Sequence, residues 1–159
     1  MPESTPPQLV QLLASQELRI RTGILELPIK LLGAEANLAV ELGVGYQNIC
    51  DWKASRIPPD QFHLGLSWEV IISDLAEALL DKTLPGYCVW LSGIDVLLAS
   101  IPFDDRKRFW DFVRGTFRRP RGLLLSLPER AVRVLPESER ASWIQFDRLS
   151  TWTDHSFKA

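Results

Sequence analysis

Basic side chains concentrate in residues 106–121, which hold seven of the 18 Lys and Arg residues and one acid. The planar guanidinium group of Arg can contact two oxygens of a phosphate or carboxylate at once. We therefore predict a site for an acidic partner or a phosphate, centred on the turn that contains Arg118, Arg119 and Arg121. The simpler interpretation is a set of solvated charges at a helix end. The seven residues are Arg106, Lys107, Arg108, Arg114, Arg118, Arg119 and Arg121.

The overall charge conceals an uneven distribution along the chain. The 159 residues carry 18 basic and 20 acidic side chains, a net charge of −2. Residues 1–80 contain five basic and ten acidic residues, whereas residues 81–159 contain thirteen and ten. The two parts therefore carry charges of −5 and +3, and partial pairing between them is expected. The near-neutral total argues against a strongly basic nucleic-acid binder but not against a local basic patch.

Few residues are available for nucleophilic or metal chemistry. The chain has two histidines, His63 and His155, and two cysteines, Cys50 and Cys88. These counts argue against a disulfide framework and a structural zinc site, and they leave two candidates for a catalytic imidazole. We predict a protein that is not an enzyme and holds no metal or cofactor. Two buried free thiols are favoured over a disulfide.

Six tryptophans are many for a chain of this length. Trp68, Trp90 and Trp110 lie in apolar segments and are predicted to be core residues. The other three, Trp52, Trp143 and Trp152, lie in predicted loops or in the tail. Core positions are favoured for them too, but exposed Trp is common at binding hot spots. We therefore expect at least one to mark a partner surface, with Trp52 and Trp143 as the candidates.

Apolar runs alternate with helical patterns along the chain. Thr5 and Ser67 are predicted to cap helices, and Gly43 to end one. Strands are predicted at residues 23–27, 44–50, 87–91 and 123–127. Helices are predicted at 8–15, 34–43, 68–82, from 104 to about 119, and at 136–146, with a loop at 51–67. The alternation predicts a three-layer α/β domain with a mostly parallel sheet of about four to five strands and helices on both faces.

One domain accounts for the whole chain, 1–159, with a core at about 20–146 and frayed ends. The first eight residues, MPESTPPQ, have neither the basic nor the apolar region of a secretion signal. No apolar run reaches the roughly 20 residues that span a bilayer. We therefore predict a cytoplasmic protein that does not bind membranes.

Two places in such a sheet could hold a phosphate or a metal ion, since ligands bind at the carboxyl ends of the strands. The loop after the first strand, LPIKLLGAEAN, has one glycine, and Leu31 follows Lys30. A phosphate loop needs several glycines and a Ser or Thr after the Lys. At the end of the third strand, Ser92 and Gly93 occupy the positions where an acid would bind magnesium, and Asp95 follows.

The segment YCVWLSGIDVLL nevertheless resembles the second acidic strand of ATPases of the large P-loop class. The later segment LLLSLPE, with Ser126, resembles their sensor strand. The chain is similar in length and architecture to the small P-loop-containing proteins of bacteriophage-exclusion defence systems. The resemblance implies a degenerate P-loop NTPase fold over about residues 20–135 and a setting in prokaryotic antiviral defence. Lys30, Ser92 and Asp95 would be remnants of a site whose nucleotide chemistry is lost.

We expect a non-catalytic accessory or scaffold subunit that binds a larger protein partner in such a defence complex. Its contact residues are predicted to be Arg114, Arg118, Arg119, Arg121, Trp52 and Trp143. One alternative is nucleic-acid binding through residues 106–121, with Phe117 and Trp110 as stacking faces. A second alternative is an atypical nucleotide-binding protein that uses Lys30 and Asp95.

Overall fold

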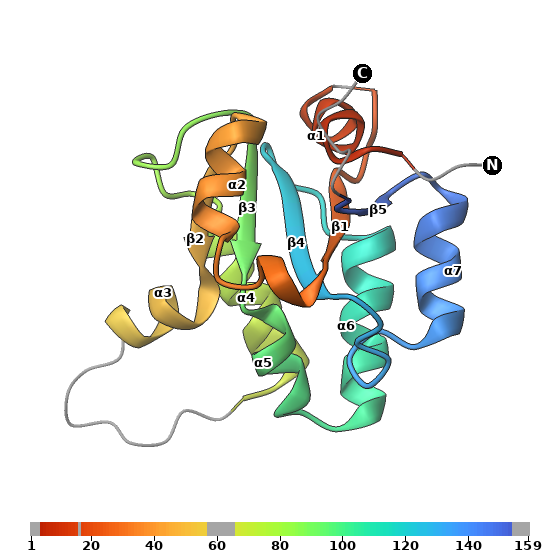
Figure 1. Cartoon of the computed structure of the whole chain (residues 1–159). Coiled ribbons are helices and arrows are strands. Elements are labelled where there is room, and N and C mark those ends of the chain that lie inside the picture. The colour runs from red at the N-terminus through yellow and green to blue at the C-terminus, as the bar shows by residue number, and fades with distance from the viewer. Residues whose placement is uncertain (1–3, 16, 57–65, 154–159) are drawn as a thin grey trace.

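A parallel sheet of five strands organises the chain (Figure 1). The computed structural model describes residues 4–15, 17–56 and 66–153, so His63 and His155 lie outside the described residues. The strands follow the order β2-β3-β4-β1-β5, and every neighbouring pair is parallel. They are β1 (Thr22–Leu27), β2 (Gly45–Asn48), β3 (Cys88–Ser92), β4 (Gly122–Pro128) and β5 (Leu149–Thr151). The predicted parallel α/β sheet is thereby confirmed.

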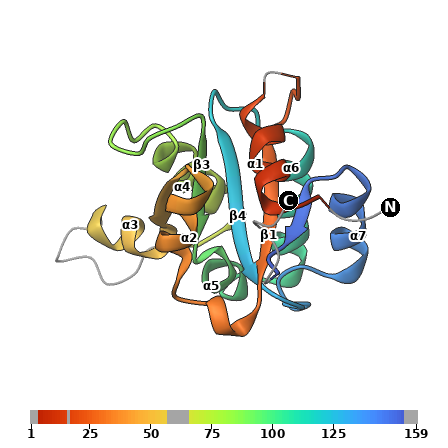
Figure 2. The same cartoon turned by 45° about the horizontal axis from the view of Figure 1, so that its top comes forward.

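Helices cover both faces of the sheet, which gives three layers. On one face, α1 (Pro6–Ala14) and α2 (Glu35–Leu42) pack against Leu25, Trp90 and Leu124. The opposite face carries α3 (Ile49–Arg56), α4 (Trp68–Ala78), α5 (Ile94–Ala99), α6 (Phe103–Gly115) and α7 (Glu137–Gln145). In Figure 2, α1 lies in front of β1, and α6 lies behind it. A short 3-10 turn, η1 (Ile29–Leu31), follows β1.

Alternate side chains of the central strands enter the two cores. In β4, Leu123 and Leu125 belong to the core under α6, whereas Leu124 belongs to the core under α1 and α2. The same alternation places Val89 and Trp90 of β3 on opposite faces. Successive strand residues point to opposite faces, so a strand covered on both sides must be apolar at almost every position. This requirement explains the unbroken apolar runs in the sequence.

The predicted helix ends are confirmed at three positions. Thr5 and Gln8 form a reciprocal capping box, in which each backbone amide donates to the other's side chain (2.9 and 3.3 Å). The Ser67 hydroxyl accepts a hydrogen bond from the amide of Val70 at 3.2 Å. Gly43 ends α2 in the left-handed region, with φ +72°.

Three predicted segments are wrong. The strand predicted at 44–50 ends at Asn48, and α3 begins at Ile49, inside the region expected to be a strand and a loop. The cause is the Asn48 side chain, whose Oδ1 accepts from the amides of Cys50 (2.9 Å) and Asp51 (3.1 Å) and so starts the helix. The segment after residue 146, predicted as a frayed tail, contains the strand β5. Within β5, the Ser150 hydroxyl donates a hydrogen bond to the Ser4 carbonyl oxygen at 2.5 Å. The six-residue α5 was also not predicted.

Both cysteines are free thiols, and the predicted burial is confirmed for Cys88 but not for Cys50. Cys88 is buried at the start of β3, and burial raises the pKa of its thiol to about 12. Cys50 is only partly buried, in α3, and burial also raises the pKa of its thiol. Over the part of the chain that the structure describes, no helix combines the length and apolarity needed to cross a membrane.

Candidate functional site

The carboxyl ends of the strands, where this architecture usually binds ligands, form an acidic crevice. Its volume is about 210 Å³. Two of its lining residues, Glu35 and Asp95, are acids, and none of those described is Lys or Arg. An anionic phosphate would therefore meet negative charge here without a compensating cation. The crevice is lined by Leu32, Glu35, Asn48, Ser92, Gly93, Asp95, Ser126, Leu127 and Pro128.

The structure brings together only part of the predicted remnant site. Ser92 and Asp95 share the acidic crevice with Ser126, but Lys30 is exposed in η1 and does not line it. The Ser92 hydroxyl oxygen lies 2.5 Å from that of Tyr46, so it is already engaged. The Asn48 side chain is committed to the start of α3. The described lining of the crevice thus contains no phosphate-binding cation, and the side chains of Ser92 and Asn48 are engaged within the fold.

A second pocket at the same edge surrounds a buried carboxylate. Glu26 of β1 accepts hydrogen bonds on both oxygens from the Arg140 guanidinium, at 2.7 to 3.1 Å, and one from Thr151 at 3.3 Å. This ion pair ties β1 to α7 and β5. This ion pair was not predicted, although the acid inside the apolar run GILEL was a usable signal. The Glu26 pocket, of about 420 Å³, is lined by Glu26, Glu129, Arg130, Val132, Glu137, Arg140 and Thr151.

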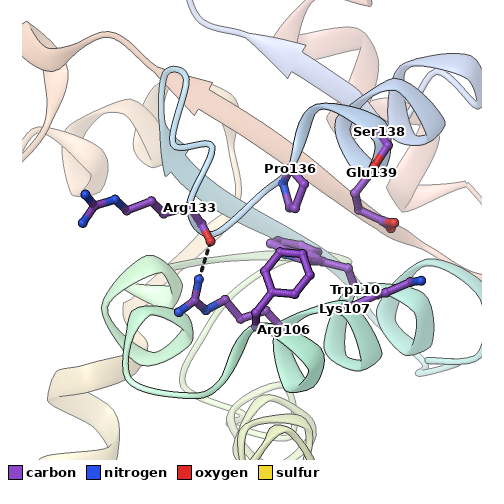
Figure 3. A pocket seen from close by; sticks show the side chains of 8 residues that line it. Arg106, Lys107, Trp110, Arg133, Pro136, Ser138 and Glu139 are labelled. Carbon is purple, nitrogen blue, oxygen red and sulfur yellow. Dashed lines mark hydrogen bonds between the residues drawn. The ribbon is translucent and has the colours of Figure 1, made fainter.

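The basic stretch 106–121 does not form one surface, because α6 separates its two ends by about 20 Å. Near the start of α6, Arg106 donates to the carbonyl oxygens of Arg133 (2.6 Å) and Ile101 (3.1 Å). Figure 3 shows this contact, with the Arg133 side chain pointing away from the pocket. Arg106 therefore braces the connection between β4 and α7. The surrounding pocket, of about 160 Å³, is lined by Phe103, Arg106, Lys107, Trp110, Arg133, Pro136, Ser138 and Glu139.

Arg114, a predicted contact residue, lies between two carboxylates. Its Nη2 donates to Asp111 Oδ1 at 3.0 Å, and its Nε lies 3.3 Å from Glu139 Oε1. Burial raises the pKa of the Glu139 carboxyl, and the charge of Arg114 opposes that rise. These contacts connect α6 to α7. Arg114 thus has a structural role, and its charge is largely balanced.

The amino ends of the strands form a basic surface instead. Arg118 and Arg119, both exposed, meet Arg19 and Arg21 from the connection between α1 and β1. The sequence analysis missed this pairing because about 100 residues separate the two segments. The usable signal was the segment RIR directly before β1, since the amino ends of parallel strands meet at one edge. This arginine hollow, of about 300 Å³, is lined by Glu17, Leu18, Arg19, Arg21, Arg118 and Arg119.

Arg121, predicted as a contact, instead holds the connection between α4 and β3. Its guanidinium donates to five backbone carbonyl oxygens at 2.6 to 3.3 Å. The acceptors belong to Leu79, Asp81, Leu84, Pro85 and Gly86.

Beside the arginine hollow lies a second, apolar hollow of about 170 Å³, and Arg119 lines both. Leu80 lines this apolar hollow and is 68% exposed. The remaining lining residues are Ala76, Leu79, Lys82, Pro120 and Arg121. The amino edge therefore presents apolar and basic side chains side by side.

The favoured core positions of Trp52 and Trp143 are confirmed, and the prediction that these rings contact a partner is wrong, because they are buried. Trp143 is 0% exposed and packs edge-to-face on Trp110 at a centroid distance of 6.0 Å. Trp52 is 5% exposed, with the Arg56 guanidinium 4.3 Å from its ring centroid. Phe117 and Trp110, predicted as stacking faces for bases, are also buried. All four rings belong to the apolar core that α3 to α7 cover, which accounts for their burial.

Comparison with known proteins adds no relative. No protein-family model and no curated protein sequence shows a significant match to this chain.

Proposed function

We propose that this protein is a non-catalytic accessory subunit that docks on an acidic surface of a larger protein. The docking surface is the amino edge of the sheet, where the arginine hollow adjoins the apolar hollow. In keeping with the resemblance to bacteriophage-exclusion proteins, the setting is a cytoplasmic prokaryotic defence complex. One observation carries the proposal: the exposed Leu80 lies next to the arginine hollow. The arginines of that hollow form no ion pair with a described carboxylate.

The chemistry of an interface supports this choice. Arg is enriched at protein interfaces, and an exposed apolar side chain with a polar rim is typical of a docking site. Arg119 lies between the two hollows, so one partner segment could place an apolar side chain on Leu80 and a carboxylate on the arginines. Opposite charge would also speed the association. The partner is accordingly a protein with acidic residues around an apolar contact.

The carboxyl edge supports the non-catalytic part of the proposal. A pseudo-ATPase would keep the sheet but lose the cation and the metal-binding acid of the nucleotide site. The acidic crevice has no Lys or Arg in its described lining, and Ser92 occupies the position of the acid. The alternative that pairs Lys30 with Asp95 has less support, because the two residues do not line the same crevice.

Nucleic-acid binding through residues 106–121 is also less well supported. Bases would need exposed aromatic faces, and Phe117 and Trp110 are buried. A duplex or single strand would need a continuous basic track, and α6 separates Arg106, Lys107 and Arg108 from Arg118 and Arg119. The basic surface that remains is local.

Co-expression with the products of the neighbouring genes tests the docking function. Size-exclusion chromatography should show a stable complex with one of them. The double variant Arg118→Glu/Arg119→Glu should weaken that complex by at least about 100-fold, because it reverses two charges at the interface. Leu80→Asp should weaken it as well.

The matched control is Lys107→Glu/Arg108→Glu, which makes the same charge change at the other end of α6. It should leave the complex intact. A chain that elutes alone in the presence of every neighbouring product, or a control that is as damaging as the double variant, would refute the proposal.

A further inference from the structure

The arginine hollow carries a charge that the described structure does not balance. Its four arginines come from two connections, and Glu17 is the one acid in its described lining. None of the four forms an ion pair with a described residue. Like charges in one hollow repel each other, so this cluster is unfavourable without an anion. We propose that the arginine hollow is a binding site for a phosphate-type oxyanion.

Arg21 provides a second observation that is independent of net charge. Its side chain is 8% exposed, and its Nη2 donates to the carbonyl oxygens of Arg119 (3.0 Å) and Pro120. These bonds hold the guanidinium against the turn before β4. Its Nη1 is buried and has no acceptor among the described residues. A buried donor without an acceptor is costly, and a shift of the Arg21 side chain that opens Nη1 to the hollow would let an oxyanion there supply the missing oxygen.

A phosphate matches this hollow better than a single carboxylate does. Four guanidinium groups and one carboxylate leave a charge of +3 in the lining. A phosphate monoester carries a charge of about −1.5 to −2 at pH 7 and three acceptor oxygens. Guanidinium groups bind such oxygens in pairs, through two parallel N–H donors. The hollow, of about 300 Å³, also has room for the group that carries the phosphate.

The inference goes beyond the proposed docking function and does not depend on it. A small anion could occupy the hollow in the free protein, and the carboxylate of a docking partner would then compete with it for the same arginines. The site also differs from a nucleic-acid interface, because it offers one local cluster and not a track of basic side chains. The ligand is therefore a single phosphate group, either a free ion or one carried on a small molecule or side chain.

Calorimetric titration of the full chain tests the site. Inorganic phosphate, pyrophosphate and O-phosphoserine are titrated separately into a buffer without phosphate. Saturable binding is expected for at least pyrophosphate, with a Kd of about 1 mM or tighter. If O-phosphoserine binds more tightly than inorganic phosphate, the ligand is a carried phosphate. If inorganic phosphate binds more tightly than O-phosphoserine, the ligand is a free ion.

Variants locate the site. Arg118→Ala should weaken binding about tenfold. Arg118→Lys should weaken it less, because lysine keeps the positive charge but lacks the two parallel N–H donors of the guanidinium. Arg108→Ala makes the same charge change at the far end of α6 and should change Kd by less than about twofold. Circular dichroism melting of each variant confirms that the fold is retained.

Four results would overturn the inference. The first is the absence of saturable heat with pyrophosphate up to about 20 mM. The second is an equal loss in Arg108→Ala and Arg118→Ala. The third is acetate binding as tightly as phosphate, which would indicate a carboxylate site. The fourth is a 12-mer of single-stranded DNA that binds about 100-fold more tightly than pyrophosphate with a steep salt dependence, which would indicate a nucleic-acid interface.

Discussion

The two edges of the sheet use charge in opposite ways. At the carboxyl edge, the buried Glu26 is matched by Arg140, and the acidic crevice is lined by Glu35 and Asp95 without a described base. At the amino edge, Arg21 and Arg121 are bound by backbone carbonyl oxygens, and Arg118 and Arg119 are exposed. Carbonyl groups orient a guanidinium without cancelling its charge. The amino edge therefore keeps a positive field that the carboxyl edge lacks.

This difference shows where to look for function in a sheet of this kind. Parallel α/β sheets usually bind ligands at their carboxyl edge. Here the acidic crevice at that edge has no Lys or Arg in its described lining, whereas the opposite edge has four arginines around one hollow. The arginine hollow thus lies at the edge where ligands are not usually expected.

The largest expected effect comes from breaking the Glu26–Arg140 ion pair at the carboxyl edge. Arg140→Ala leaves the Glu26 carboxylate buried without its main partner, and the free energy of unfolding should fall by about 3 kcal/mol. Urea unfolding at pH 7 measures the change. Arg133→Ala, an exposed basic residue at the same edge, is the control and should cost less than about 0.5 kcal/mol. Equal losses in the two variants would mean that the Glu26 pair does not hold this edge.

A smaller effect tests the carbonyl-bound arginines of the amino edge. Arg121→Ala removes five hydrogen bonds to backbone oxygens, so the free energy of unfolding should fall by about 2 kcal/mol. Hydrogen exchange should become faster in residues 79–86 before it does elsewhere. Arg118→Ala, three residues earlier and exposed, should leave both measurements nearly unchanged. Fast exchange confined to other segments would contradict this role for Arg121.

The smallest effect concerns Cys88, which begins β3 at the amino edge. Burial raises the pKa of its thiol from 9.0 to about 12, so the unfolded chain loses the proton first as pH rises. Below pH 9 the thiol makes its full contribution to the free energy of unfolding, and this contribution is lost between pH 9 and 12. The free energy of unfolding should fall by about 1 kcal/mol from pH 8 to pH 10. Unfolding of the native chain and of Cys88→Ala, compared at both pH values, isolates this contribution. An equal loss in both proteins would assign the pH dependence to other groups.

Much of the fold could be predicted because burial on both faces leaves a simple pattern. The runs at β1, β3 and β4 are apolar at most positions, and side-chain caps mark the starts of α1 and α4. Short elements were missed for a physical reason: β5 has three residues, too few for any periodicity. Its position depends on contacts with distant residues such as Ser4 and Glu26, which no local pattern encodes.

The candidate site was predicted only in part. Arg118 and Arg119 belong to it, but Arg114 and Arg121 are engaged in the fold, and Trp52 and Trp143 are buried. Sequence alone cannot distinguish an arginine that faces solvent from one that binds carbonyl oxygens. It also could not join Arg19 and Arg21 to the turn before β4 without the strand order, which places β1 beside β4.

The short outer strands limit how another chain can recognise this protein. The sheet ends in β2, with four residues, and in β5, with three. A long free edge would let a foreign strand extend the sheet through backbone pairing, which is a route both to peptide capture and to aggregation. These two strands offer little backbone for such pairing. The docking that we propose would therefore depend on side-chain identity, so that single substitutions could change the partner.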